Sequence, residues 1–171
     1  MNYLAFQPAF DVLHTEFRFL RLRRMIGSDA SWHFDKLRII DFYLVFFFRL
    51  TEVRLLPKHR ALKKLALEYS RKHYEMQPDD HLLFSRMEVS QKAAITSLVS
   101  FGYFDNQQFE HELLVSTRLT EPDRLNKRIE EINANEERLI KALGEIATYE
   151  TLGPDGLKAR SGLIEHRYDK V

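Results

Sequence analysis

The chain has 171 residues, of which 44% are hydrophobic and 30% charged, a balance that suits one domain with its own core. It contains no cysteine, so disulfides and thiolate sites for metal binding or nucleophilic catalysis are excluded. The apolar run from Phe42 to Phe48 is far shorter than the roughly 20 residues that a membrane-spanning helix needs. The first ten residues lack the pattern of a signal peptide, and we expect a cytoplasmic protein without membrane contact.

The net charge of +1 conceals two oppositely charged portions of the chain. Residues 1–74 carry a net charge of +7, whereas residues 75–171 carry −6. A basic portion can meet phosphates or an acidic partner, while an acidic portion discourages nucleic acid. Two ordinary solvated surfaces explain the same distribution equally well.

The first predicted helix lies in residues 7–25 and has a high density of arginines. Apolar residues such as Leu13, Phe17 and Leu20 share one side of it, at spacings of three and four. Its later turns carry four candidates for contact with phosphates or an acidic partner: Arg18, Arg21, Arg23 and Arg24. The simpler interpretation of these arginines is a solvated face.

The second predicted helix, "DKLRIIDFYLVFFFRL" in residues 35–50, has Asp35 as its expected N-cap. Apolar side chains cover nearly its whole circumference, which is typical of a helix central to its domain or buried between two chains. Ordinary core is favoured over a subunit interface. If two copies pair through this helix, the candidate contacts are Phe42, Phe46 and Phe48.

A basic helix is predicted in residues 55–76. It supplies the second set of candidates for contact with phosphates or an acidic partner: Lys58, Arg60, Lys63 and Lys64. A shorter helix in residues 88–101 is expected to end at Gly102, and Asp105 is placed to cap one further turn. Alternating side chains in residues 112–120 then predict a strand.

The last long helix is predicted in residues 122–149, with Thr120 as its N-cap. Its apolar residues step by four and three in a heptad seam that has one polar member, Glu136. The seam residues that are candidates for an interface are Leu125, Ile129, Ile132, Glu136, Leu139 and Leu143. Glu136 either sets the register of a helix pair or faces water at a bend.

This order of elements predicts a mainly α fold with a winged helix-turn-helix-like core, a reduced β wing and a long C-terminal helix. The expected division is a core domain in residues 1–120, the heptad helix in 121–150 and a tail in 151–171. A winged helix raises the alternative of a DNA-binding transcriptional regulator. The would-be recognition helix, however, offers only Lys92 and Gln91 as long base-reading side chains, so non-specific phosphate contact is favoured over base reading.

The sequence predicts no catalytic, cofactor or metal site. Its seven histidines are scattered, and "EHE" at 110–112 in a strand would place the two carboxylates on one side and the imidazole on the other. There is no His-Glu-x-x-His, no phosphate-binding glycine loop and no Gly-x-Ser-x-Gly. We therefore expect a protein that is not an enzyme.

Four stretches, "QPAFDVLHTEFRFLRL", "KLRIIDFYLVFF", "RMEVSQKAAITSLVSFGYFD" and "SGLIEHRY", carry a resemblance to a known family. They resemble the middle component of bacterial ABC-three-component conflict systems, of which Lamassu-type anti-phage modules are relatives. The resemblance implies a small non-enzymatic adaptor between an SMC- or Rad50-like ABC ATPase and a separate effector, such as a nuclease. It transfers no catalytic residues to this sequence.

Overall fold

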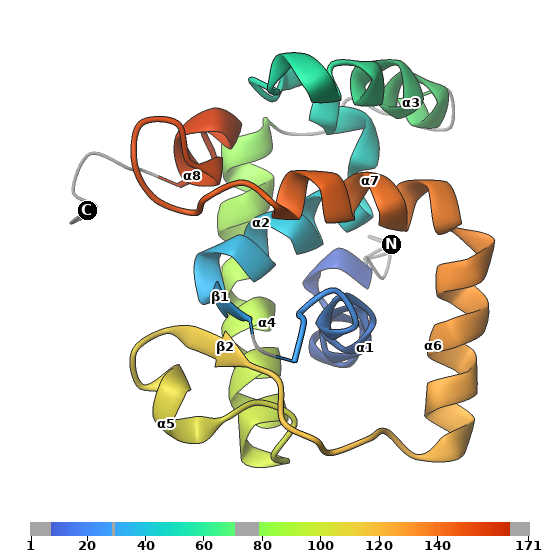
Figure 1. Cartoon of the computed structure of the whole chain (residues 1–171), viewed down its shortest axis with the longest axis vertical. Helices are drawn as coiled ribbons and strands as arrows, with labels where there is room; N and C mark the ends of the chain where they lie inside the picture. Colours follow the sequence, from blue (N-terminus) through green and yellow to red (C-terminus); the bar gives the residue numbers. More distant parts are fainter. Residues whose placement is uncertain (1–7, 29, 71–78, 165–171) are drawn as a thin grey trace, which may run out of the picture.

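The computed structural model describes residues 8–28, 30–70 and 79–164, which form a largely helical fold (Figure 1). Its α-helices are α1 (Val12–Arg23), α2 (Phe34–Val45), α3 (Ala61–Ser70), α4 (Asp80–Ser100), α5 (Asn106–Phe109), α6 (Asp123–Asn135), α7 (Glu137–Ala147) and α8 (Leu157–Ser161). Three 3-10 helices, η1 (Pro8–Phe10), η2 (Phe47–Glu52) and η3 (Pro57–His59), and two strands, β1 (Ser31–His33) and β2 (Leu113–Val115), complete it.

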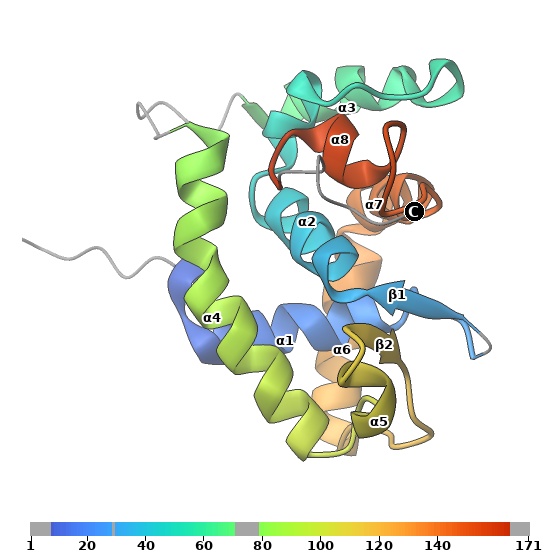
Figure 2. The same cartoon turned by 90° about the vertical axis from the view of Figure 1, so that its left-hand side faces the viewer.

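Helix α2 lies at the centre of the fold, and the prediction that this segment is core is confirmed. Five of its side chains have almost no exposed surface: Leu37, Ile39, Ile40, Phe42 and Tyr43. Helices α1, α4, α7 and α8 all pack against α2 (Figures 1 and 2). A helix that is apolar nearly all round is stable in water only when neighbours cover it in this way.

The central helix differs from its prediction at both ends. Its N-cap is His33 rather than Asp35, because the Nδ1 atom of His33 accepts the backbone N–H of Asp35 at 3.1 Å. The helix ends just before Phe46, whose backbone leaves the helical region (φ −118°, ψ 54°), and the chain continues as η2. This change of direction places Phe47 against Tyr69 of α3, with ring centroids 5.0 Å apart, so η2 becomes the platform on which α3 packs.

The winged-helix arrangement is not confirmed. The predicted recognition helix is the second part of the longer helix α4, whose main neighbour is α1. Helix α3 packs chiefly on η2, so α3 and α4 do not form the close crossing that the motif requires (Figure 2). The predicted strand appears as β2, and its partner is β1, which pairs with it in antiparallel register with Trp32 opposite Leu114.

The prediction of one long C-terminal helix is wrong, because the chain bends at Glu136 (φ −109°, ψ 27°) and forms α6 and α7. Figure 1 shows the two helices running in different directions along two sides of the molecule. Helix α6 packs on α1, whereas α7 packs on α2. The apolar residues of the heptad seam therefore pack against the core of their own chain on both sides of the bend, and Glu136 lies at the bend itself.

Two of the predicted helix stop and cap residues are confirmed, and a third, Thr120, is not. Gly102 has the expected left-handed backbone (φ 86°) just after α4, and the Asp105 carboxylate accepts the backbone N–H of Gln108 to cap α5. Thr120 does not cap α6, which begins at Asp123 without a side-chain cap.

One buried apolar cluster includes residues from all three predicted segments, from Ala9 to Leu163. The division of the chain at residues 120 and 150 stays a prediction. Residues 71–76 of the predicted basic helix and residues 165–171 of the predicted tail lie outside the described residues. Among the described helices, none is long and apolar enough to cross a membrane.

Candidate functional site

Arg18 of α1 is buried and makes a two-pronged ion pair with Asp41 of α2. Its Nε and Nη2 atoms donate to the two carboxylate oxygens at 2.5 and 3.1 Å, and its remaining donors reach the Pro8 carbonyl and the Thr15 hydroxyl. Asp41 has no exposed surface and also accepts from Nε2 of Gln91 on α4 at 3.0 Å. Buried charges are tolerated when they are paired and hydrogen-bonded in this way, and this pair connects α1, α2 and α4.

Arg21, one turn further along α1, connects this helix to the bend between α6 and α7. Its Nε donates to Oδ1 of Asn133 at 2.8 Å, and its Nη2 forms an ion pair with the Glu136 carboxylate. Arg21 is buried, while the Glu136 side chain is 44% exposed. The polar member of the heptad seam therefore has a partner inside the same chain.

Arg23 and Arg24 share one buried carboxylate, that of Glu121. Arg23 Nη1 donates to Oε1 of Glu121 at 2.8 Å, and Arg24 Nη2 donates to Oε2 at 2.6 Å. Arg23 also donates to the carbonyls of Thr117 and Leu119, both at 2.8 Å. These contacts fix the segment that leads from β2 to α6.

Arg18, Arg21 and Arg23 of α1 and Arg24 just after it are thus all engaged within the chain. The first three are buried, and the four do not form an open phosphate-binding face. Arginine suits this role because its planar fork of donors matches a carboxylate at two points. The candidate site predicted here is a set of ion pairs that join this end of α1 to α2, to the bend between α6 and α7 and to the segment before α6.

The two base-reading candidates on α4 are also occupied. Gln91 is fully buried, and its Oε1 accepts from Nε of Arg38 at 3.1 Å. Lys92 pairs with Glu88 one turn earlier, and this hydrogen bond holds the pKa of the Glu88 carboxyl below its usual range. Arg38 itself also reaches Asp35 and Glu88. This network could not be predicted from the sequence, because helical periodicity does not report which polar groups meet.

The apolar interface candidates lie mainly inside the chain. Phe42 and Phe46 are buried, and Phe48 is half-buried below the guanidinium of Arg49. In the seam, the buried members are Ile129, Leu139 and Leu143, and the half-buried ones are Leu125, Ile132 and Glu136. Their role in an interface stays a prediction, and most of their surface is used by the core.

The cations that follow η2 differ from the buried, paired arginines of α1, because most of them are exposed. We call residues 57–70, which contain η3 and α3, the basic arm. Lys58, Arg60 and Lys64 are exposed and Lys63 is half-buried, and none of the four forms an ion pair with any described residue. Leu67, at 56% exposure, lies on the same outward side of α3. The basic arm lies at the edge of the molecule (Figures 1 and 2).

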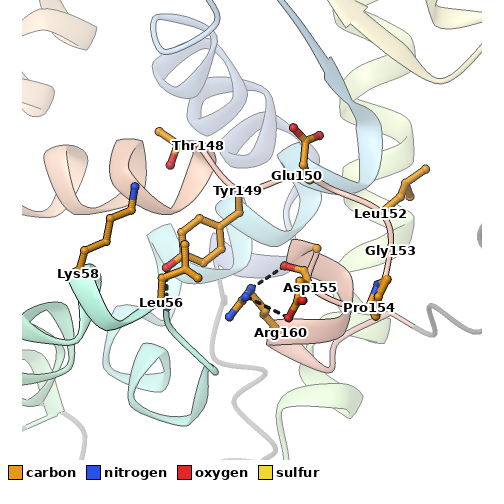
Figure 3. A pocket seen from close by; sticks show the side chains of 11 residues that line it. Leu56, Lys58, Thr148, Tyr149, Glu150, Leu152, Gly153, Pro154, Asp155 and Arg160 are labelled. Atoms are coloured by element: carbon orange, nitrogen blue, oxygen red, sulfur yellow. Dashed lines mark hydrogen bonds and ion pairs between the residues drawn. The ribbon is translucent and has the colours of Figure 1, made fainter. Parts of the chain in front are cut away.

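A hollow of about 410 Å³ lies beside the start of the basic arm, between η3 and the loop that joins α7 to α8 (Figure 3). Its apolar lining includes Leu56, Leu152 and Pro154. The Tyr149 hydroxyl accepts the backbone N–H of Leu56 at 3.0 Å and contacts Nδ1 of His59 at 2.8 Å.

Two of the four charged residues that line this hollow pair with each other. Arg160 pairs with Asp155 at 3.1 Å and donates to the carbonyls of Asp155 and Arg54, and Figure 3 shows Arg160 beside Asp155. Lys58 of the basic arm and Glu150 also line the hollow. The hollow has the size of a small ligand site, but Arg160 and Asp155 are occupied by each other. Across the described ranges, no cluster of three or more His, Asp and Glu is arranged to hold a metal.

The described residues thus form a mainly helical scaffold that is joined by internal ion pairs of arginines and carries exposed cations on the basic arm. A family model, described as ABC-three component (ABC-3C) system Middle Component 5, matches residues 4–169. The chain belongs to this family of ABC-3C middle components. Neither a curated protein nor a solved structure matches the chain.

Proposed function

We propose that this chain is a non-enzymatic adaptor subunit that joins an SMC- or Rad50-like ABC ATPase to an effector, such as a nuclease. It would act in the bacterial cytoplasm, in an anti-phage system of the Lamassu type. The observation that carries the proposal is the family match over residues 4–169, because a middle component is by name one part of a multi-component system.

The use of the charged side chains supports an adaptor. Buried ionic groups among the described residues pair with each other across the fold, such as Arg18 of α1 with Asp41 of α2, and Arg23 of α1 with Glu121 in the segment before α6. Groups that fix helices in this way build a rigid scaffold, and a rigid scaffold lets binding surfaces meet partners with little cost in conformational entropy. The same pairing weakens the alternative of a DNA-binding regulator, since the arginines of α1 are occupied.

The test is reconstitution with the ABC ATPase and the effector encoded beside the chain. Each protein is purified separately, and mixtures of two and three are analysed by gel filtration with light scattering. We expect the ATPase and the effector to elute together only when the chain is present. Elution of those two together without the chain, or failure of the chain to bind either one, would refute the adaptor proposal.

Two further measurements address self-association and DNA contact. Light scattering of the chain alone over a range of concentrations separates a monomer from the homodimer that the phenylalanine helix or the seam would form. A DNA shift assay over a salt series separates a regulator, which prefers its own promoter, from weak contact without sequence preference that is lost as salt rises.

A further inference from the structure

We propose that the outward face of the basic arm docks onto an acidic surface of a partner protein, with Leu67 entering an apolar depression there. This inference rests on the adaptor function, and it names the surface through which one partner is held. The chemistry of the partner follows from three features of the arm. These are cations that have no ion pair among the described residues, an exposed leucine and a placement on a fixed platform.

The first feature is a concentration of positive charge without internal compensation. Residues 53–67 contain five cations, Arg54, Lys58, Arg60, Lys63 and Lys64, and no Asp or Glu. Arg54 faces Asp155 at 3.7 Å, but the other four have no ion pair within the part of the chain that the structure describes. Elsewhere in the basic portion the arginines of α1 and Arg38 of α2 all have carboxylate partners. The carboxylates that match the basic arm are therefore expected on another molecule.

The positions of Lys63 and Lys64 add to this argument. Both lie in the first turn of α3, which contains no acidic residue. The positive end of the helix dipole is located there, so cations are unfavourable and acids favourable at these positions. The two lysines do not serve the stability of α3, whereas an external acidic surface would stabilise both.

The second feature distinguishes a protein partner from nucleic acid. Leu67 follows Lys63 by four residues and Lys64 by three, so the lysines flank it one turn earlier on the same side of α3. Leu67 is 56% exposed. An apolar centre with a charged rim is the usual anatomy of a protein–protein interface. Phosphate contact needs only cations and has no use for an exposed leucine.

The third feature is the fixed position of the arm. The opposite side of α3 is buried: Leu62 and Ala66 lie in the core, and the Tyr69 ring packs edge-on against Phe47 of η2. At its edge, Glu68 pairs with Arg138 of α7 at 3.1 Å. The outward face is therefore presented in a defined orientation, which lowers the entropy lost on docking.

The experiment measures binding of the fluorescently labelled full-length chain to three purified probes. The probes are the neighbouring ABC ATPase, the neighbouring effector and a DNA duplex of about 30 base pairs, each tested at several salt concentrations from about 50 to 200 mM. The variants are Lys63→Glu with Lys64→Glu, and Leu67→Ser. Matched controls are Lys127→Glu on α6 and Leu13→Ser on α1, because Lys127 is exposed and Leu13 is 71% exposed. Circular dichroism checks that every variant is folded.

We expect one of the two proteins to bind the unaltered chain, with an affinity that falls as salt rises. The double lysine variant should weaken that binding about tenfold or more and flatten its salt dependence, because it removes the charged rim. Leu67→Ser should weaken it at every salt concentration, since it removes the apolar anchor. The two control variants should bind as the unaltered chain does.

Three results would overturn the inference, and the first of them leaves the adaptor function intact. If the chain binds a protein probe and both α3 variants bind equally well, the docking surface lies elsewhere and the adaptor function stands. If only the DNA is bound, and the lysine variant loses it, the arm is a phosphate-binding surface. If no protein probe is bound by the unaltered chain, both proposals fail together.

Discussion

Two groups of cations in the basic portion of this chain have opposite environments: one faces the interior and the other faces outward. The first group, Arg18, Arg21 and Arg23 of α1 with the adjacent Arg24, turns inward to carboxylates. Those carboxylates lie on α2, just before α6 and at the bend between α6 and α7. The group on the basic arm is mostly lysine and points outward without a described partner. Both groups contribute to the net charge of +7 of residues 1–74. The first group holds parts of the fold together, whereas the second lies on the surface.

The difference teaches that residue type carries information that net charge does not. An arginine presents five donors in a planar fork, so one buried side chain can satisfy a carboxylate and several carbonyls together. A lysine ammonium is more strongly hydrated and is seldom fully buried without a partner. The comparison predicts that changes on α1 alter stability, whereas changes on the basic arm alter binding alone.

The largest effect is expected from Asp41→Ala. The substitution leaves the buried guanidinium of Arg18 without its carboxylate, and removing one partner of a buried pair costs about 3–5 kcal/mol. Urea unfolding followed by circular dichroism measures the change in free energy, with Lys127→Ala on α6 as an exposed control. A loss below about 1 kcal/mol would mean that Arg18 finds another partner or reaches solvent, and that α1 is not tied as described.

Glu121→Gln is expected to lower the free energy of unfolding by a smaller but still measurable amount. The amide keeps the shape of the side chain but removes the charge that faces both Arg23 and Arg24. Hydrogen bonds to charged groups contribute about 1.5–3 kcal/mol, and we expect a loss of that order in urea unfolding. Arg24→Ala provides the matched comparison: Arg24 is the more exposed of the two arginines, so its removal should cost less than Glu121→Gln. Equal losses would show that exposure does not decide the contribution of these pairs.

The bend between α6 and α7 offers a third test, in which Glu136→Ala should lower the free energy of unfolding by roughly 0.5–1.5 kcal/mol. Glu136→Ala removes the partner of Arg21, but Glu136 is half-exposed and Arg21 keeps its hydrogen bond to Asn133. Helix content should not rise, because the burial of Ile129 on one side of the bend and Leu139 on the other fixes both helices. A gain in ellipticity at the helical wavelength would indicate that α6 and α7 fuse, and that the ion pair rather than the core creates the bend.

Several features that depend on neighbours in the chain were predicted from the sequence, although the caps expected at Asp35 and Thr120 were not found. The central helix, the stop at Gly102 and the cap at Asp105 are all encoded within a few residues, and the structure contains them. The features that were missed depend on contacts distant in sequence. Arg23 meets Glu121 from 98 residues away, and Arg21 meets Glu136 from 115.

The bends were missed for the same reason. An apolar stripe can continue smoothly through Glu136 while the backbone turns, because residues on both sides of the bend still face the same core. Phe46 likewise fits a helical pattern but leaves the helix where η2 forms to support α3. Of the candidate site residues, Arg18, Arg21 and Arg23 are buried rather than part of a solvated face. The exposure of the basic arm agrees with the solvated face that lysines usually form.

The smallest effect on stability is expected from the largest change in charge. Replacing Lys58, Arg60, Lys63 and Lys64 together by Glu should leave the free energy of unfolding within about 0.5 kcal/mol, or raise it slightly. Exposed side chains without partners contribute little to stability, and acids in the first turn of α3 suit the helix dipole better than lysines do. Urea unfolding of this variant and of Asp41→Ala, measured side by side, gives the sharpest form of the comparison. The fourfold variant reverses four charges, whereas Asp41→Ala removes only one. A loss above about 1 kcal/mol would show that the basic arm has carboxylate partners within its own chain, and the contrast between inward arginines and outward lysines would not hold.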